Sequence, residues 1–359
     1  MKKVPLIAYC ALFLGVCAFF SLGMLIPGAA NAAEGDVTMP KLLTDSPYIS
    51  INSDFGDEFE EYFQKSFAYR NNVVSAFSSL KTSLFSEGNE QVIVGNDGFL
   101  FFNDTLYDYM GTDPMSDEEI EAAADALLMI YERASEDGAR FIFAPAPNKN
   151  TVYPEMMPSR YIANKEASNL DRLFSKLDEN GVPYVDLRPI LSDAKNDTLV
   201  YHKRDTHWNN EGARIAFEAI AEKIGFDCPD YSQFGGHAVH DHVGDLDTLL
   251  FPAREMYDDN TSYNFSEMYV FTTAYSTPMD VRIATRGGGK ENLLMFRDSF
   301  ANAIIPFAAS GFSEVRFERG SPYCDNLQVL DSFDADYVIV MIAERNLRNL
   351  ISQSQTDSK

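Results

Sequence analysis

The stretch that decides the fold is "LLMFRDSFANAIIPF", residues 293–307. It begins with an apolar run of strand length and continues with helical spacing. A short apolar strand that leads directly into a helix is typical of a mostly parallel sheet with helices packed on it. Ser299 stands at the junction, where we expect its hydroxyl to project from the carboxyl edge of that sheet.

The same alternation continues on both sides of this segment. Amphipathic helices are predicted at 116–138, 164–181 and 209–225, and apolar strands at 139–145, 182–187, 313–318 and 335–343. The first helix opens with a capping box of Ser116 and Glu119 and ends at Gly138. The predicted fold class is therefore α/β, with a mostly parallel sheet between two helical layers.

The chain divides into four predicted segments. Residues 1–33 combine two lysines, an uncharged apolar run and an A-x-A cleavage signal, so they form either a signal peptide or a membrane anchor at residues 4–26. Both alternatives place the remainder outside the cytoplasm. An N-terminal helical segment follows at 34–90, the catalytic domain spans 91–346, and 347–359 is expected to be a flexible tail.

Two parts of the catalytic domain differ from the strand–helix rhythm. "QVIVGNDGFLFF", residues 91–102, predicts a β-hairpin in which Gly98 adopts a positive φ. The polar stretch at about 228–290 is interpreted as an insertion of loops that can include one further hairpin.

The composition restricts the partners. A net charge of −25 disfavours nucleic acid, because the chain offers little to neutralise phosphates. Two of the four cysteines, Cys10 and Cys17, lie in the apolar N-terminal run. Cys228 and Cys324 could pair in an oxidising compartment, and the sequence leaves this open.

"YHKRDTHWNNEGA", residues 201–213, supplies possible partners for Ser299. In an extended backbone, Asp205 and His207 point the same way, so the carboxylate can hold Nδ1–H while Nε2 remains free. Asn209 or Asn210 then caps the following helix. The predicted constellation is Asp205 as orienter, His207 as general base and Ser299 as nucleophile. The alternatives are a helix-capping Ser299, a surface His207 and a turn-forming Asp298.

Further candidates surround this constellation. Arg297 and Arg345 lie at predicted strand ends on the same edge of the sheet, either as oxyanion donors or in salt bridges. The loop after residue 145 carries Asn148, Lys149 and Tyr153, for substrate contact or loop scaffolding. Trp208, the single Trp, could stack on a sugar or pack in the core.

"GHAVHDHVGD", residues 236–245, gathers three histidines and two aspartates and raises the question of zinc. These residues are His237, His240, His242, Asp241 and Asp245. Since no matching Cys or His lies elsewhere, we predict no metal and interpret the segment as a polar loop near the cleft.

Five blocks, in this order, resemble the AlgX/AlgJ-type SGNH hydrolase-like O-acetyltransferases and the related DHHW-motif proteins. They are "FEEYFQKSFAYRN", "VIVGNDGFLFF", "APAPNKNTVYPEMMP", "RDTHWNNEGA" and "LLMFRDSFANAIIPF", and the resemblance covers about residues 55–346. It implies a flavodoxin-like, three-layer SGNH fold with circularly permuted motif order. It also implies a Ser299 nucleophile with Asp205 and His207, and neither metal nor cofactor. The implied reaction is extracytoplasmic acetyl transfer to polysaccharide hydroxyls, with a membrane-bound O-acyltransferase as donor.

The chain departs from the family pattern in two places. Thr206 stands where the DHHW proteins have His, and its side chain is expected to face away from the Asp–His pair. The chain ends soon after "VIVMIAERNL", so we expect no additional carbohydrate-binding module. The acidic charge counts against alginate, itself a polyanion, as acceptor, and a neutral or wall-associated glycan fits at least as well. Alternative functions are an acetyl-polysaccharide esterase and a non-catalytic glycan-binding or assembly subunit.

Overall fold

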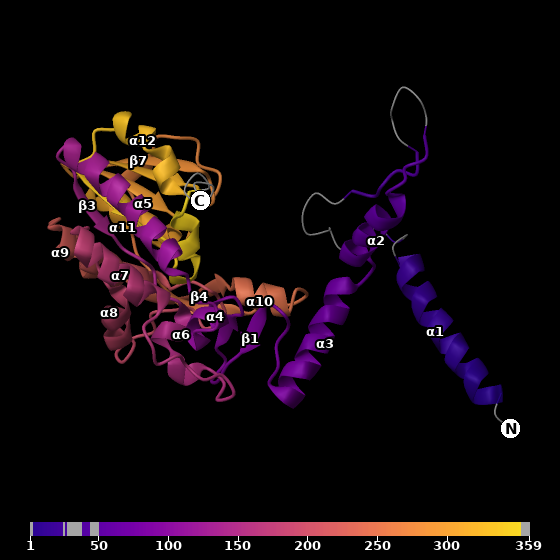
Figure 1. Cartoon of the computed structure of the whole chain (residues 1–359). Coiled ribbons are helices and arrows are strands. Elements are labelled where there is room, and N and C mark those ends of the chain that lie inside the picture. Colours follow the sequence, from indigo (N-terminus) through magenta and orange to yellow (C-terminus); the bar gives the residue numbers. More distant parts are fainter. Residues whose placement is uncertain (1–2, 24–25, 27–37, 44–49, 353–359) are drawn as a thin grey trace. The chain divides into compact units, whose positions relative to one another are not determined.

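The structure is a computed structural model, which describes residues 3–23, 26, 38–43 and 50–352. Its chain forms two units (Figure 1). One contains residues 1–86 and 248–255, and the other contains 87–247 and 256–359. All candidate site residues belong to the second unit.

The first unit is helical. Its helices are α1 (Lys3–Gly23), α2 (Phe55–Ser66) and α3 (Arg70–Phe85). Tyr69 separates α2 from α3, because its φ of 58° is left-handed and interrupts the helix. The apolar N-terminal run does form a helix, α1, but within the described residues no helix is long and apolar enough to cross a bilayer. The predicted cleavage site at Ala30–Ala32 lies outside the described residues.

A six-stranded sheet forms the centre of the second unit, in the order β3-β10-β8-β9-β7-β6. The first four strands are parallel, and β7 and β6 continue the sheet antiparallel. Their bounds are β3 Arg140–Phe143, β10 Tyr337–Val340, β8 Asn292–Arg297, β9 Glu314–Arg319, β7 Arg282–Gly287 and β6 Tyr269–Phe271. This confirms the predicted mostly parallel sheet.

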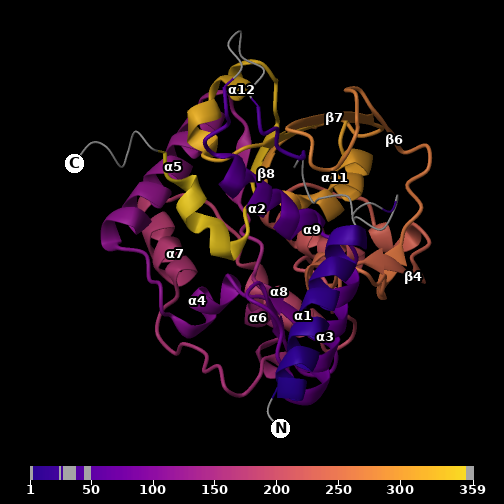
Figure 2. The same cartoon turned by 90° about the vertical axis from the view of Figure 1, so that its right-hand side faces the viewer.

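Helices cover both faces of the sheet (Figure 2). On one face lie α5 (Asp117–Glu136), α7 (Asn169–Asn180) and η5 (Glu344–Leu350); on the other lie α8 (Leu187–Ala194), α9 (Asn210–Ile224) and α11 (Ile305–Gly311). Successive side chains of β10 point to opposite faces of the sheet, so Val338 packs toward α5 while Ile339 packs toward α9. The strand therefore supports a helical layer on each face. The capping box of Ser116 and Glu119 is confirmed.

One predicted strand is wrong. Residues 182–187 make a single bridge, between Tyr184 and Phe143. The segment cannot continue as a strand because Asp186 already caps α8, accepting a hydrogen bond from the Arg188 N–H at 3.0 Å.

The predicted hairpin at 91–102 is confirmed as β1 (Val92–Val94) paired with β2 (Leu100–Phe102). Asp97 and Gly98 in its turn have φ values of 51° and 83°, as a two-residue reversal of this kind requires. The Leu100 N–H donates to the Lys203 carbonyl at 2.8 Å, which ties β2 to the segment that precedes Asp205. Beside it lie α4 (Thr105–Met110), α6 (Lys149–Val152) and η1 (Pro154–Met156).

The predicted insertion contains more regular structure than expected. A hairpin is present, formed by β4 (His237–Val243) and β5 (Tyr257–Ser262), but β6 and β7 of the same stretch belong to the central sheet. A short helix, α10 (Asp245–Leu250), lies between β4 and β5 in the chain. The remaining elements are η2 (Tyr231–Gln233), η3 (Ser299–Ala303), η4 (Tyr323–Asn326) and α12 (Gln328–Asp331).

One smaller expectation is corrected, and one question that the sequence left open is answered. Leu347 and Leu350 are buried in the core, so residues 347–350 are not part of a flexible tail. Cys228 and Cys324 are free thiols, and no disulfide joins them.

Candidate active site

Asp205 and His207 meet through a bend, not through the extended backbone that we predicted. Residues 203–207 are bent, and Asp205 Oδ1 accepts hydrogen bonds from the His207 backbone N–H at 2.8 Å and from Nδ1–H at 2.7 Å. An Asp side chain often bonds to the backbone two residues ahead in this way. The bend therefore fixes both the backbone and the imidazole of His207 on one carboxylate oxygen.

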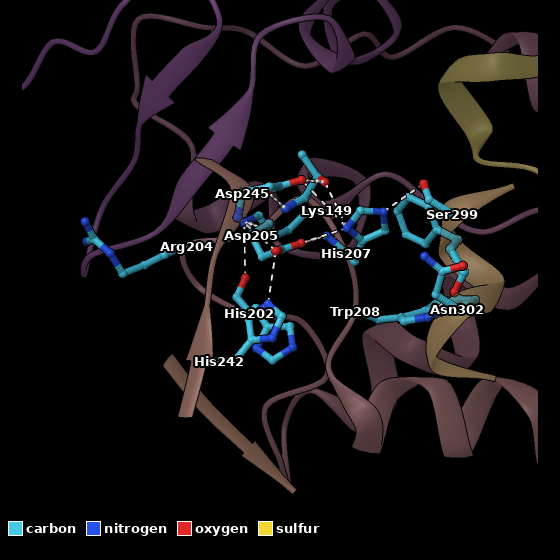
Figure 3. Close-up of polar contacts among 12 residues, drawn as sticks. Lys149, His202, Arg204, Asp205, His207, Trp208, His242, Asp245, Ser299 and Asn302 are labelled. Carbon is cyan, nitrogen blue, oxygen red and sulfur yellow. Dashed lines mark hydrogen bonds and ion pairs between the residues drawn. The ribbon is translucent and has the colours of Figure 1, made fainter. Parts of the chain in front are cut away.

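Ser299 lies directly after β8, at the carboxyl edge of the parallel strands. Its Oγ is 2.9 Å from His207 Nε2, so the structure brings together all three predicted triad members (Figure 3). Asn209, two residues after His207, caps α9 by accepting from the Gly212 N–H at 2.8 Å. Ser299 does not act as a helix cap, because Asp298 fills that position.

The turn that follows Ser299 is shorter than predicted. It is a five-residue 3-10 helix, η3, and the Asp298 carboxylate already accepts from the Phe300 N–H at 2.9 Å. Its dipole is accordingly small. The Ser299 N–H, at the first position of η3, has no acceptor within that turn and can face an oxyanion.

Arg297 does not reach the reaction centre. Its side chain is fully buried, and it donates from Nη1 to Asn302 Oδ1 at 2.7 Å and from Nη2 to the Asp280 carbonyl at 3.0 Å. Burial, with Arg319 nearby, lowers the pKa of Arg297 to about 10. Arg297 occupies the amide oxygen of Asn302, the residue three positions after the nucleophile. The Nδ2 group of Asn302 donates one N–H to the weak acceptor Met279 Sδ at 3.6 Å and has a second N–H to offer.

Arg345 is the second arginine of the prediction, and it is half-buried. Its guanidinium lies over the Phe300 ring at 5.4 Å and over the Phe102 ring at 5.5 Å. Within the described part of the chain it makes no salt bridge, so the ion-pair alternative is not observed. A guanidinium held on two aromatic faces beside the nucleophile keeps its donors available for a substrate oxygen.

The other four candidates are buried scaffold residues. Lys149 donates from Nζ to the carbonyls of His202, Lys203 and Asp205, and the Tyr153 hydroxyl accepts from the Val200 N–H. The Trp208 ring is 1% exposed, and its Nε1–H donates to the Phe300 carbonyl at 2.9 Å. Asn148 is fully buried. All four side chains are buried, so of the two alternatives that the sequence leaves open for them, substrate contact or support of the site, the structure favours support.

Burial shifts the pKa values of two ionisable groups in this scaffold toward their neutral forms. It lowers the pKa of Lys149 to about 7 and raises the pKa of Glu344 to about 7. Glu344 accepts from the Asn148 N–H and the Thr151 hydroxyl, both at 2.8 Å, and anchors the loop before α6.

Glu344→Gln is expected to remove a pH dependence of stability. The folded state holds the Glu344 proton up to about pH 7 and the unfolded chain only to about 4.5, so stability falls as pH rises between these values. The variant should gain a few kcal/mol relative to wild type at pH 8 and much less at pH 4.5. Denaturant unfolding at both pH values measures this, with the surface variant Glu314→Gln as control. An equal difference at both pH values would contradict the buried-carboxyl assignment.

Comparison with known proteins finds similar sequences of one kind. The profile of the "SGNH hydrolase-like domain, acetyltransferase AlgX" matches residues 92–266. "Probable alginate O-acetylase AlgJ" of Pseudomonas syringae is 25% identical over 256 residues, covering 70% of this chain and 61% of that protein. Its Pseudomonas aeruginosa counterpart is 24% identical over 205 residues, 57% of this chain and 50% of that protein.

Solved structures extend the comparison to the fold. PatB1 of Bacillus cereus superposes with a TM-score of 0.54 at 19% identity, covering 72% of this chain and 97% of that one. The O-acetyltransferase domain of Pseudomonas putida AlgJ gives 0.52 at 19% identity, with 73% and 94% covered. Residues 92–266 thus resemble the SGNH hydrolase-like domain of AlgX, and the similarity to the AlgJ proteins supports the same family. The predicted SGNH hydrolase-like fold is thereby confirmed.

Similarity to the AlgJ proteins does not by itself transfer an activity, since the chain spans only 50–61% of the length of these two curated relatives. The site must therefore be interpreted from its own groups. Burial would raise the pKa of Asp205, but hydrogen bonds from His207 and His242 hold it well below the usual range. An ionised Asp205 can stabilise an imidazolium at His207.

Thr206, the departure from the DHHW pattern, does not face away from the pair as we expected. Its Oγ1 lies 3.1 Å from His207 Nδ1 and donates to the Asp245 carboxylate. Asp205, His207 and Asp245 also offer ligand atoms within 4.8 Å of one another. However, both ring nitrogens of His207 already have partners in Asp205 and Ser299, so this arrangement suits proton transfer better than metal binding.

Three functional residues were missed as such in the sequence: Asn302, His242 and Asp245. Asn302 could have been found from its position three residues after Ser299 on the predicted helix. His242 and Asp245 were noted only as a possible metal motif, because nothing local indicates that this hairpin reaches Asp205.

Proposed function

We propose that the protein is a serine-dependent O-acyltransferase that moves acetyl groups onto hydroxyls of a polysaccharide. The observation that carries the proposal is the continuous chain of hydrogen bonds from Asp205 through His207 to Ser299, at 2.7 and 2.9 Å. Nucleophile, base and orienter in this order are the minimum needed for acyl transfer through a serine ester.

The reaction follows from these positions. Ser299 Oγ attacks the acetyl carbonyl while its proton passes to His207 Nε2, and the tetrahedral oxyanion is stabilised by the Ser299 N–H and Asn302 Nδ2. On collapse, the donor oxygen leaves with the proton from His207, and acetyl-Ser299 remains. A glycan hydroxyl then attacks the ester, His207 removes its proton, and Ser299 is released.

The partners form part of the same proposal. The acetyl donor would be a membrane-bound O-acyltransferase, and the acceptor an exported or cell-surface polysaccharide outside the cytoplasm. The charged start and apolar run of residues 1–33 support export. The net charge of −25 favours a neutral acceptor over a polyanion such as alginate.

The test compares transfer with hydrolysis. The protein is incubated with p-nitrophenyl acetate and either neutral or uronate oligosaccharides, and mass spectrometry quantifies acetylated sugar against free acetate. Acetylated oligosaccharide that depends on Ser299 supports the transferase. Acetate alone would identify an esterase, which is the competing outcome because the His207 side chain is 27% exposed and within reach of water. Glycan binding with no ester turnover would indicate a non-catalytic subunit.

Asn302→Ala is expected to lower kcat about 100-fold, because it removes one oxyanion donor while the triad stays intact. The change should fall on kcat more than on KM, since the interaction forms only in the transition state. Steady-state hydrolysis of p-nitrophenyl acetate measures it, with Asn326→Ala on η4 as control. A rise in KM with unchanged kcat would assign Asn302 to ground-state binding instead.

A further inference from the structure

Oδ2 of Asp205, its outer oxygen, is held by the hairpin region, which contains residues 236–245, the segment whose histidines and aspartates raise the question of zinc. His242 Nε2 lies 3.0 Å from Asp205 Oδ2, and the Asp245 backbone N–H donates to the same oxygen at 3.0 Å (Figure 3). His207 occupies the other oxygen, Oδ1. A single carboxylate therefore joins two imidazoles, one from the catalytic bend and one from β4.

The hairpin region also fixes the bend from outside. The Asp245 carboxylate accepts from the Thr206 backbone N–H at 2.8 Å and from the Thr206 hydroxyl. A Cβ at Gly244 would lie 2.1 Å from the Arg204 carbonyl oxygen, so only glycine permits this close approach. The Arg204 N–H donates to Asp258 of β5 at 2.6 Å. Both strands of the hairpin and the residues after β4 thus hold the segment that carries Asp205 and His207.

The surroundings of His242 favour a cation there. Burial opposes its charge, but Asp205, Asp258 and Asp245 outweigh this and raise the pKa of His242 above 6.5. Its ring stacks on that of His202 at 3.7 Å between centroids and 9° between planes. Burial, together with the neighbouring His242, lowers the pKa of His202 to about 3, so the stacked partner stays neutral. The ionisable groups around the stacked rings of His242 and His202 are Asp205, Asp245, Asp258 and Lys149.

We propose that His242 is a positioning residue of the acyl-transfer site, which fixes the outer oxygen of Asp205 and, when protonated, competes with His207 for the negative charge of that carboxylate. Two cations that share one carboxylate disfavour each other, so a protonated His242 makes His207 a weaker base and keeps it neutral to lower pH. The inference rests on the proposed function, because it assumes that His207 activates Ser299.

His242→Gln tests the proposal, since a glutamine amide can still donate to Asp205 Oδ2 but cannot become charged. The readout is the rate at which a sulfonyl fluoride labels Ser299 between pH 4 and 9. In that reaction Ser299 Oγ bonds to sulfur, fluoride leaves, and the hydroxyl proton passes to His207. The acid limb of the profile is the range in which the labelling rate falls as the pH is lowered. We expect this limb to shift to higher pH by about one unit in the variant, which is the size of a charge interaction across a partly hydrated carboxylate.

The matched control is His240→Gln. His240 lies on the same strand and also contacts a carboxylate, Asp259 Oδ1 at 2.9 Å, but both members of that pair are exposed. It should leave the acid limb unchanged. A merely structural role of His242 would lower the labelling rate or the melting temperature without moving the limb, and an unmoved limb in His242→Gln overturns the proposal.

A second measurement separates this inference from the proposed function. The His207 imidazole is titrated by NMR in protein with ¹³C-labelled histidine, for wild type and His242→Gln. If wild-type Ser299 is not labelled at all, the proposed function fails, and the titration still decides the role of His242. A His207 pKa that does not rise in the variant contradicts the proposal.

Discussion

Ser299→Ala should lower acetyl transfer by on the order of 10⁴ or more, the loss expected when the nucleophile of a triad is removed. The Oγ of Ser299 is the only atom of the proposed chain that can form the acyl-enzyme, and it lies 2.9 Å from His207 Nε2. Alanine removes it without disturbing its supports, since Asp298 caps η3 and the Trp208 Nε1–H holds the Phe300 carbonyl. Turnover of p-nitrophenyl acetate and acetylation of an oligosaccharide measure the loss.

Ser313→Ala is the matched control for that variant. Ser313 is half-buried like Ser299, lies after α11 at the start of the next strand, and contributes only backbone hydrogen bonds. Both variants should unfold at the wild-type temperature. If Ser299→Ala retained more than a tenth of wild-type turnover, another group would have to be the nucleophile and the triad would be rejected.

The sequence predicts the groups of this site better than their local geometry. Residue type and position between predicted elements nominate Ser299, Asp205 and His207 as candidates, because strand ends of a parallel sheet meet at one edge, and the family resemblance implies their roles. The bend at 203–207 was not predictable, since it depends on Lys149, Asp245 and Asp258, which lie far away in the chain.

Dependence on residues that lie far away in the chain also explains why the sequence does not determine the roles of Arg297 and Trp208. Arg297 follows a strand and looks like an oxyanion donor in sequence, yet the amide oxygen of Asn302 and a carbonyl of the loop before β7 take its hydrogen bonds. Trp208 beside a catalytic His suggests a sugar platform, but the Phe300 carbonyl binds its indole N–H in the core. A periodic pattern determines which face of an element is apolar, whereas the partner of a buried polar atom is set by tertiary contacts.

Asp205→Asn should lower kcat about 10³- to 10⁴-fold, for a reason specific to this carboxylate. Both of its oxygens face backbone donors: the His207 N–H at Oδ1 and the Asp245 N–H at Oδ2. An asparagine amide must therefore direct its NH₂ group at one of these two N–H donors. When the NH₂ group faces His207, it forces the imidazole proton from Nδ1 to Nε2. A protonated Nε2 can no longer accept the proton of Ser299. Asp259→Asn on β5, which changes the exposed carboxylate beside His240, is the matched control. Steady-state kinetics should show the loss in kcat with KM little changed, and a variant that raised KM alone would assign Asp205 to substrate binding.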